Sequence, residues 1–119
     1  MGQRRSTYDD RILVTDASGG AAMGVMRGID GEPVSVFVGD VDPYAPGLYQ
    51  VPPANRLLLP HPEDPGFADA LLAGCRREGI SVLLPTGVAG LPAIAGRADD
   101  FSRSGVRLML APLPALQRA

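Results

Sequence analysis

Short apolar runs alternate along the chain with stretches whose apolar residues recur at helical spacing. The apolar runs predict buried strands over residues 11–16, 34–38, 56–59, 80–84 and 106–110. Helical spacing predicts helices over residues 21–29, 65–78 and 91–104, and the first turn of another at 113–118. A long irregular stretch, residues 40–55, separates the second strand from the third, and loops of this length are often functional.

Several residues mark where the predicted helices begin and end. Asp64 can cap free backbone N–H groups, and Pro65 suits the first helical position, so the clearest helix starts there. Gly79 is placed to end this helix and Gly105 to end the next one.

Strands that alternate with helices predict an α/β domain, an open Rossmann-like three-layer fold with a mostly parallel sheet of about five strands. Right-handed crossovers leave few topologies, and we favour the strand order 3-2-1-4-5 over the flavodoxin-like order 2-1-3-4-5. Residues 11–119 form the single predicted domain, and residues 1–10 a flexible polar lead-in. In either order a ligand is expected at the carboxyl ends of the strands. Those ends carry residues 16–20, 40–49, 85–90 and 111–114.

Composition limits the possible partners and compartment. A chain of 119 residues suits one core, and its positive charge comes from 11 Arg, with no Lys. Residues 1–60 hold five Arg against seven acids and residues 61–119 six against six, which predicts no basic face and no nucleic-acid partner. No apolar run approaches the ~18–20 residues of a membrane span. A polar N-terminus without a signal peptide, and Cys75 as the single cysteine, favour the cytoplasm.

The clearest candidate site is the glycine turn of residues 16–24, between the first strand and the first helix. Glycines there let backbone N–H groups approach an anion, but they equally allow close helix–strand packing, and the sequence leaves both open. The spacing differs from G-x-G-x-x-G, and a P-loop would need a Lys. Asp40 ends the second strand, where an acid in dinucleotide-binding folds binds a ribose hydroxyl. Because the glycine spacing of this chain does not fit the dinucleotide-binding motif, we favour a role for Asp40 in a turn.

The remaining titratable groups suggest no catalytic centre. His61 lies between two prolines without an evident partner, so we interpret it as a surface histidine. Cys75 occupies the inward face of a helix, as a small buried hydrophobe does. The acid pairs at residues 9–10 and 99–100 are interpreted as solvated, and no metal-ligand cluster is visible.

Four segments in order resemble carbamoyl-phosphate-synthase-like ATP-grasp proteins. Residues 12–20 resemble the first strand and glycine turn of that family, and residues 42–49 its loop after the second strand. Residues 64–86 are similar to its helix and strand leading to a Pro-Thr corner, here Pro85-Thr86, and residues 105–110 to the strand before the catalytic part. The match covers about residues 11–116.

This resemblance implies a pre-ATP-grasp domain, the N-terminal substrate-side part of an ATP-dependent carboxylate ligase. The chain would not be catalytic alone and would hold no cofactor, because ATP and Mg²⁺ would bind in a catalytic domain that this chain lacks. That domain would be its partner, in cis or in trans, and a homodimer through the same surface is expected otherwise. By transfer, the substrate-binding residues would be Ser18, Gly19, Gly20, Tyr44, Pro85, Thr86 and Gly87.

One departure from the family keeps other functions open. Acidic residues commonly follow the Pro-Thr corner in such proteins, whereas residues 87–91 here are Gly-Val-Ala-Gly-Leu. A stand-alone small-molecule-binding or regulatory module that has kept the fold and lost the enzyme is therefore the alternative. A nucleotide-dependent oxidoreductase domain is a third hypothesis, against which the glycine spacing argues. The chain ends inside a predicted helix start, and the sequence leaves open whether the natural protein ends at Ala119.

Overall fold

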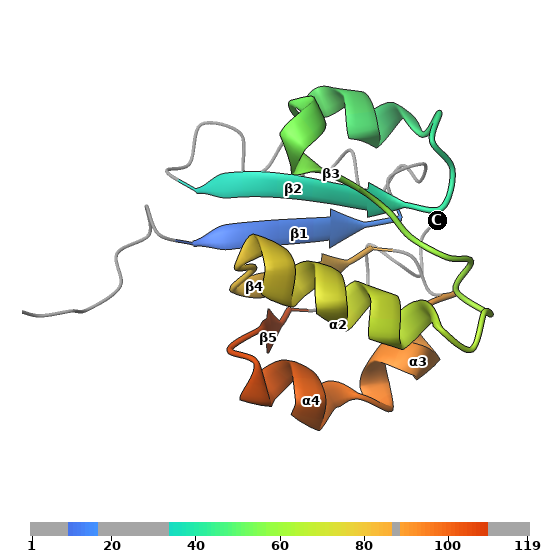
Figure 1. The fold of residues 1–119 in the computed structure, drawn as a ribbon, viewed down its shortest axis with the longest axis vertical. Helices are drawn as coiled ribbons and strands as arrows, with labels where there is room; N and C mark the ends of the chain where they lie inside the picture. Colours follow the sequence, from blue (N-terminus) through green and yellow to red (C-terminus); the bar gives the residue numbers. More distant parts are fainter. Residues whose placement is uncertain (1–9, 17–33, 87–88, 110–119) are drawn as a thin grey trace, which may run out of the picture.

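Within the described residues, five parallel strands form one sheet at the centre of the domain (Figure 1). The computed structural model describes residues 10–16, 34–86 and 89–109. The strands are β1 (Arg11–Thr15), β2 (Ser35–Asp40), β3 (Arg56–Leu58), β4 (Val82–Pro85) and β5 (Arg107–Leu108). Their order is β3-β2-β1-β4-β5, and every neighbouring pair is parallel. The favoured order is therefore confirmed, and the flavodoxin-like order is wrong.

The two faces of the sheet bury different side chains of the same strands, because successive residues of a strand point to opposite faces. One face packs Leu13, Phe37 and Leu83 against α2 (Phe67–Glu78), α3 (Leu91–Ala95) and α4 (Ala98–Arg103). On the other face lie Val14, Val38 and Leu84. Val38 contacts the buried residues of the long loop, which contains the 3₁₀ helices η2 (Pro46–Gln50) and η3 (Pro53–Asn55). The predicted helix over 21–29, the start at 113–118 and residues 1–9 of the lead-in lie outside the described residues.

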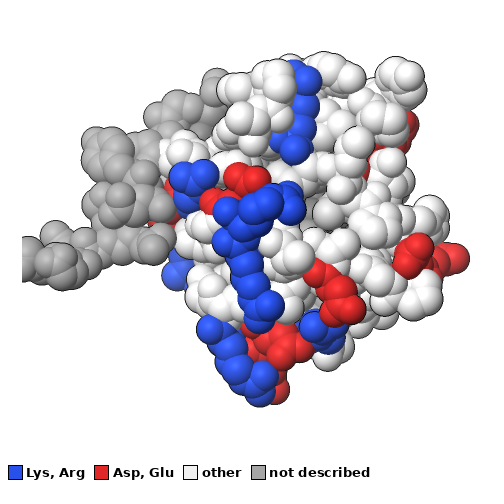
Figure 2. Space-filling view, viewed as in Figure 1, with Lys and Arg blue, Asp and Glu red and all other residues white. Residues whose placement is uncertain are grey.

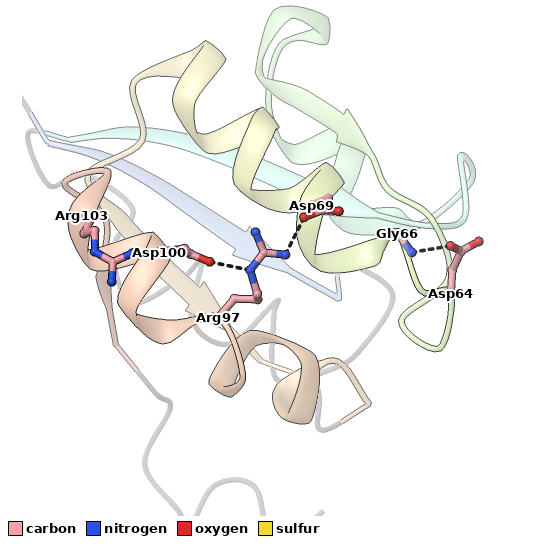
Figure 3. Close-up of polar contacts among 6 residues, drawn as sticks. All are labelled: Asp64, Gly66, Asp69, Arg97, Asp100 and Arg103. Carbon is pink, nitrogen blue, oxygen red and sulfur yellow. Dashed lines mark hydrogen bonds and ion pairs between the residues drawn. The ribbon is translucent and has the colours of Figure 1, made fainter.

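Helix α2 begins later than the sequence predicted. The Oδ1 atom of Asp64 accepts the backbone N–H of Gly66 at 2.7 Å (Figure 3). The Asp64 carbonyl accepts the N–H of Phe67 at 2.9 Å. These bonds close a turn that contains Pro65, and the residue that caps the helix is Gly66. The start at Asp64-Pro65 was therefore wrong, because the Asp64 side chain stabilises a turn instead of the first helical N–H groups.

The predicted helix over 91–104 is divided into α3 and α4. Gly96 and Arg97 separate them, and Arg97 has non-helical backbone angles (φ −118°, ψ 19°). Ile94 and Phe101 are buried, whereas Ala95 and Ala98 on either side of the break are exposed. A glycine favours such a break because it lowers helix propensity.

Arg97 joins the elements on this side of the sheet. Its Nη1 atom donates to Asp69 of α2, and its Nε atom donates to Asp100 of α4 at 2.6 Å (Figure 3). The Arg97 hydrogen bond is the main reason that the pKa of Asp100 is lowered from its usual value. These partners are partly or largely exposed, so the contribution of the network to stability is small.

Strand boundaries differ from the sequence prediction by a few residues. β4 includes Pro85, which had been expected to stop it, and β5 consists of Arg107 and Leu108 alone. Pro85 is the last residue of β4, so the backbone donor that it lacks is missing only at the end of the strand. No helix in the described part of the chain is long and apolar enough to cross a membrane.

Gly79 ends α2 as predicted, and its replacement should be costly. Its φ of 66° is in the left-handed region, and its N–H donates to the Arg76 carbonyl at 3.3 Å. We expect Gly79→Ala to lower the free energy of unfolding by about 1 kcal/mol, because a Cβ is strained at this φ. The matched control is Gly96→Ala, where φ is −67° and the added Cβ would meet the Pro92 carbonyl oxygen at an ordinary 3.4 Å. Urea titrations of both variants measure the difference, and equal losses would contradict it.

Candidate site at the carboxyl edge of the sheet

A cavity of about 250 Å³ lies where β1, β2 and β3 end. This is the edge at which open α/β sheets bind ligands. Its described lining comes from the strand ends, the loops that follow them, the start of α2 and the segment before α3. The lining residues are Thr15, Asp16, Asp40, Val41, Asp42, Leu59, His61, Pro62, Phe67 and Ala89.

Three carboxylates line the cavity, and two of them are held by consecutive turns. The Oδ1 atom of Asp40 accepts the N–H of Asp42 at 2.9 Å, and the Oδ1 atom of Asp42 accepts the N–H of Tyr44 at 2.9 Å. Asp40 is only 5% exposed, so its carboxylate is fixed in position by the domain itself. Asp16 follows β1 with φ 64°, a conformation that Asp tolerates better than most residues. With three carboxylates in its described lining, this edge favours cationic or hydrogen-bond-donating ligands.

The opposite part of the lining is apolar and closely packed. Leu59 and Phe67 belong to the main core cluster, and the Leu59 N–H donates to the Asp40 carbonyl at 3.0 Å. A Cβ on Gly39 would come within 3.0 Å of Leu59, and one on Gly90 within 3.1 Å of the Phe67 ring. Both glycines therefore permit a close approach that shapes this wall of the cavity.

The Pro85-Thr86 corner is joined to the end of β1. Pro85 pairs in register with Thr15, and the Thr86 hydroxyl donates to the Thr15 carbonyl at 2.7 Å. Thr86 is 3% exposed, so its hydroxyl bonds within the protein. The corner adjoins the cavity through Thr15, but Pro85 and Thr86 do not line it.

The other residues proposed from the resemblance are not brought together within the described residues. Tyr44 is 82% exposed, and it does not line the cavity. Ser18, Gly19, Gly20 and Gly87 lie outside the described residues. The prediction that Asp40 occupies a turn is confirmed by its bond to Asp42, although its side chain also lines the cavity.

His61 and Cys75 occupy the environments that the sequence indicated. His61 is exposed, and its Nδ1 atom accepts the N–H of Glu63 at 3.1 Å. Cys75 is 1% exposed, and burial raises the pKa of its thiol to about 12. A thiol with this pKa is protonated at neutral pH, so it does not act as a nucleophile. Among the residues that the structure describes, no group of acids, His and Cys is arranged to hold a metal ion.

Sequence reasoning missed the contribution of the third strand to this edge. Leu59, His61 and Pro62 follow β3, whose end was not among the strand ends predicted to face a ligand. The sequence did contain a signal for this third strand end. Pro60 ends a short apolar run, and the ends of parallel strands lie at one edge of the sheet. Phe67 lies in the helix predicted over residues 65–78, and nothing in the sequence marked it as part of a site.

Comparison with known proteins supports the fold and does not extend to an activity. No family model and no curated protein matches the chain. Among solved structures, a dTDP-glucose 4,6-dehydratase from Bacillus anthracis in complex with NAD is similar, with a TM-score of 0.61 and 11% identity. The domain is Rossmann-like. The similarity covers 86% of this chain and 37% of the dehydratase chain, and at this identity it concerns the fold alone.

Proposed function

We propose that this Rossmann-like domain is the substrate-side N-terminal domain of an ATP-grasp carboxylate ligase. In this proposal the carboxyl-edge cavity forms one wall of the acceptor-substrate site. ATP and Mg²⁺ bind in a separate catalytic domain, joined in cis or in trans. The domain positions a substrate and completes no reaction by itself.

The observation that carries the proposal is the size and lining of the carboxyl-edge cavity. Ligand pockets commonly enclose ~300–1,000 Å³, and this cavity of about 250 Å³ is smaller. A second domain packed over this edge would enlarge and close the site. The described residues provide a buried carboxylate, Asp40, and an apolar wall containing Phe67, which suit positioning of a substrate.

The first test is the gene sequence beyond the codon for Ala119. We expect the reading frame to continue into an ATP-grasp domain with its lysines and magnesium-binding acids. If instead it stops, a separate ATP-grasp subunit should copurify with the chain from its native source. A stop codon without such a subunit would overturn the proposal.

The second test uses the complete ligase and the variant Asp40→Asn. Because hydrogen bonds to a buried charged group contribute about 1.5–3 kcal/mol, we expect the KM for the acceptor to rise roughly ten- to a hundredfold. The KM for ATP should not change, since ATP binds in the other domain. ADP formation measured against acceptor and ATP concentration separates the two effects.

Asp64→Asn is the matched control for Asp40→Asn. Asp64 also accepts the N–H of the residue two positions later, but it does not line the cavity. The control should therefore keep both KM values. Unchanged acceptor kinetics in Asp40→Asn, with the variant folded, would exclude this cavity from the substrate site.

A stand-alone small-molecule-binding module is a second candidate function. The observation in its favour is that residues of this one domain form the cavity. A ligand that raises the Tm of the isolated chain, and does so less in Asp40→Asn, would support it. NAD and NADP belong in that screen, because the similar dehydratase was solved with NAD.

A further inference from the structure

Five arginines that are dispersed in the sequence gather at the amino edge of the sheet, opposite the carboxyl-edge cavity. In parallel α/β units the strands begin and the preceding helices end at one edge. Here Arg11 and Arg107 begin β1 and β5, Arg76 and Arg77 lie in the last turn of α2, and Arg103 ends α4. In Figure 2 most blue side chains lie in the left half of the view, toward the side where the strands begin, with red side chains beside them at the centre and bottom.

Hydrogen bonds to the hydroxyl and the carbonyl of Ser81 hold this edge together. The N–H of Arg11 donates to the Ser81 hydroxyl at 3.0 Å, and the N–H of Arg107 donates to the Ser81 carbonyl at 2.9 Å. The even distribution of charge along the chain had predicted no basic face. At this edge arginines nevertheless gather, with the carboxylates of Asp10, Glu78 and Asp100 beside them, because position in the sequence does not determine position in the fold.

A basin of about 460 Å³ lies between the ends of α2 and α4. Arg76, Arg103 and the hydroxyl-bearing residues Ser81 and Ser104 contribute its polar groups, and no acidic residue is among its described lining. The Nε atom of Arg76 donates to the Ser104 hydroxyl at 2.9 Å, which orients the guanidinium beside the basin. A guanidinium has five N–H donors, and this bond uses one of them.

The neighbouring acids neutralise only part of this charge. Asp100 accepts from the Nη1 atom of Arg103 at 3.0 Å, and Glu78 accepts from the Nε atom of Arg77 at 3.1 Å. The charges of Arg103 and Arg76 both help to lower the pKa of Asp100, after the larger effect of its Arg97 hydrogen bond. The positive charges of Arg76, on α2, and Arg103, on α4, therefore both influence Asp100.

We propose that this basin, here called the amino-edge basin, binds a small polyvalent oxyanion carrying phosphate or carboxylate groups. Two guanidinium groups match the acceptor oxygens of such a ligand, and the Ser81 hydroxyl donates instead to the Asp10 carboxylate at 3.2 Å. The volume is in the range of metabolite sites. Binding is non-covalent, because Cys75, which also lines the basin, is only 1% exposed. The site is separate from the carboxyl-edge cavity and does not depend on the proposed ligase function.

Calorimetric titration of the full chain with pyrophosphate tests the proposal. Ionic strength is held constant with sodium chloride, because surface charges are screened by salt. We expect saturable binding of pyrophosphate. The double variant Arg76→Gln/Arg103→Gln should bind at least about fivefold more weakly, because it removes two exposed positive charges. Titrations with citrate identify the ligand chemistry, since tighter binding of pyrophosphate indicates a phosphate-bearing ligand and tighter binding of citrate a polycarboxylate.

Arg77→Gln is the matched control for these variants. It removes the same charge one residue away, from a side chain that does not line the basin. The affinity of Arg77→Gln for pyrophosphate should stay within about twofold of that of the unsubstituted chain. The single variant Arg103→Gln leaves the Arg76–Ser104 bond intact, so it tests binding even where loss of Arg76 disturbs the fold. Equal weakening in Arg77→Gln, or no saturable binding at 10 mM pyrophosphate (about the weakest affinity expected of a specific site), would overturn the proposal.

Discussion

Replacing Phe101 by alanine is expected to lower the free energy of unfolding by about 3–5 kcal/mol. The Phe101 side chain is completely buried, and it belongs to the core cluster that also contains Ile94 and Val106. Helix α4 has six residues and α3 has five, which is too short for either to be stable without packing. Loss of the ring should therefore release α4 from the sheet before the central strands unfold. Urea unfolding followed by circular dichroism measures the total loss.

Two controls show whether packing of the ring is responsible. Phe101→Leu fills most of the same space and should cost less than about 1.5 kcal/mol. Tyr44→Ala removes a larger aromatic side chain that is 82% exposed, and the change should stay within about 0.5 kcal/mol. A loss below about 1 kcal/mol in Phe101→Ala would mean that α4 contributes little to the core.

The sheet could be predicted because its signals are local and strong. Apolar runs bounded by Gly or Pro located all five strands, and the rule for right-handed crossovers narrowed their order. Helix boundaries were less certain, because competing local bonds determine them. Asp64 could have capped α2 but bonds to Gly66 instead, and the break at Gly96 has no apolar signal to mark it.

The candidate sites depend on contacts between distant segments, which a sequence read position by position does not contain. The carboxyl-edge cavity combines Asp40 with Phe67, and the amino-edge basin combines Arg76 with Ser104. Both pairs become visible only when the strand order is known. The arginines show a further regularity, since Arg76 and Arg77 occupy the last turn of α2, where positive charge interacts favourably with the helix dipole.

Replacing Thr86 by valine is expected to lower the free energy of unfolding by about 1–3 kcal/mol. The Thr86 hydroxyl donates to the Thr15 carbonyl at 2.7 Å, and both residues are buried. Valine has nearly the same shape, so the variant leaves no large cavity and removes one hydrogen bond between the ends of β1 and β4. The Thr15 carbonyl would lose this partner where water has little access.

The sign of the Thr86→Val effect is decisive, because burying a methyl group in place of a hydroxyl is favourable by itself. A net loss of stability therefore measures the hydrogen bond, and a variant as stable as the original chain would show that the bond contributes nothing. Thr86→Ser keeps the hydroxyl and should lose less stability than Thr86→Val. Since Thr15 lines the carboxyl-edge cavity, Thr86→Val should also weaken any ligand bound there, whereas the distant amino-edge basin should keep its affinity.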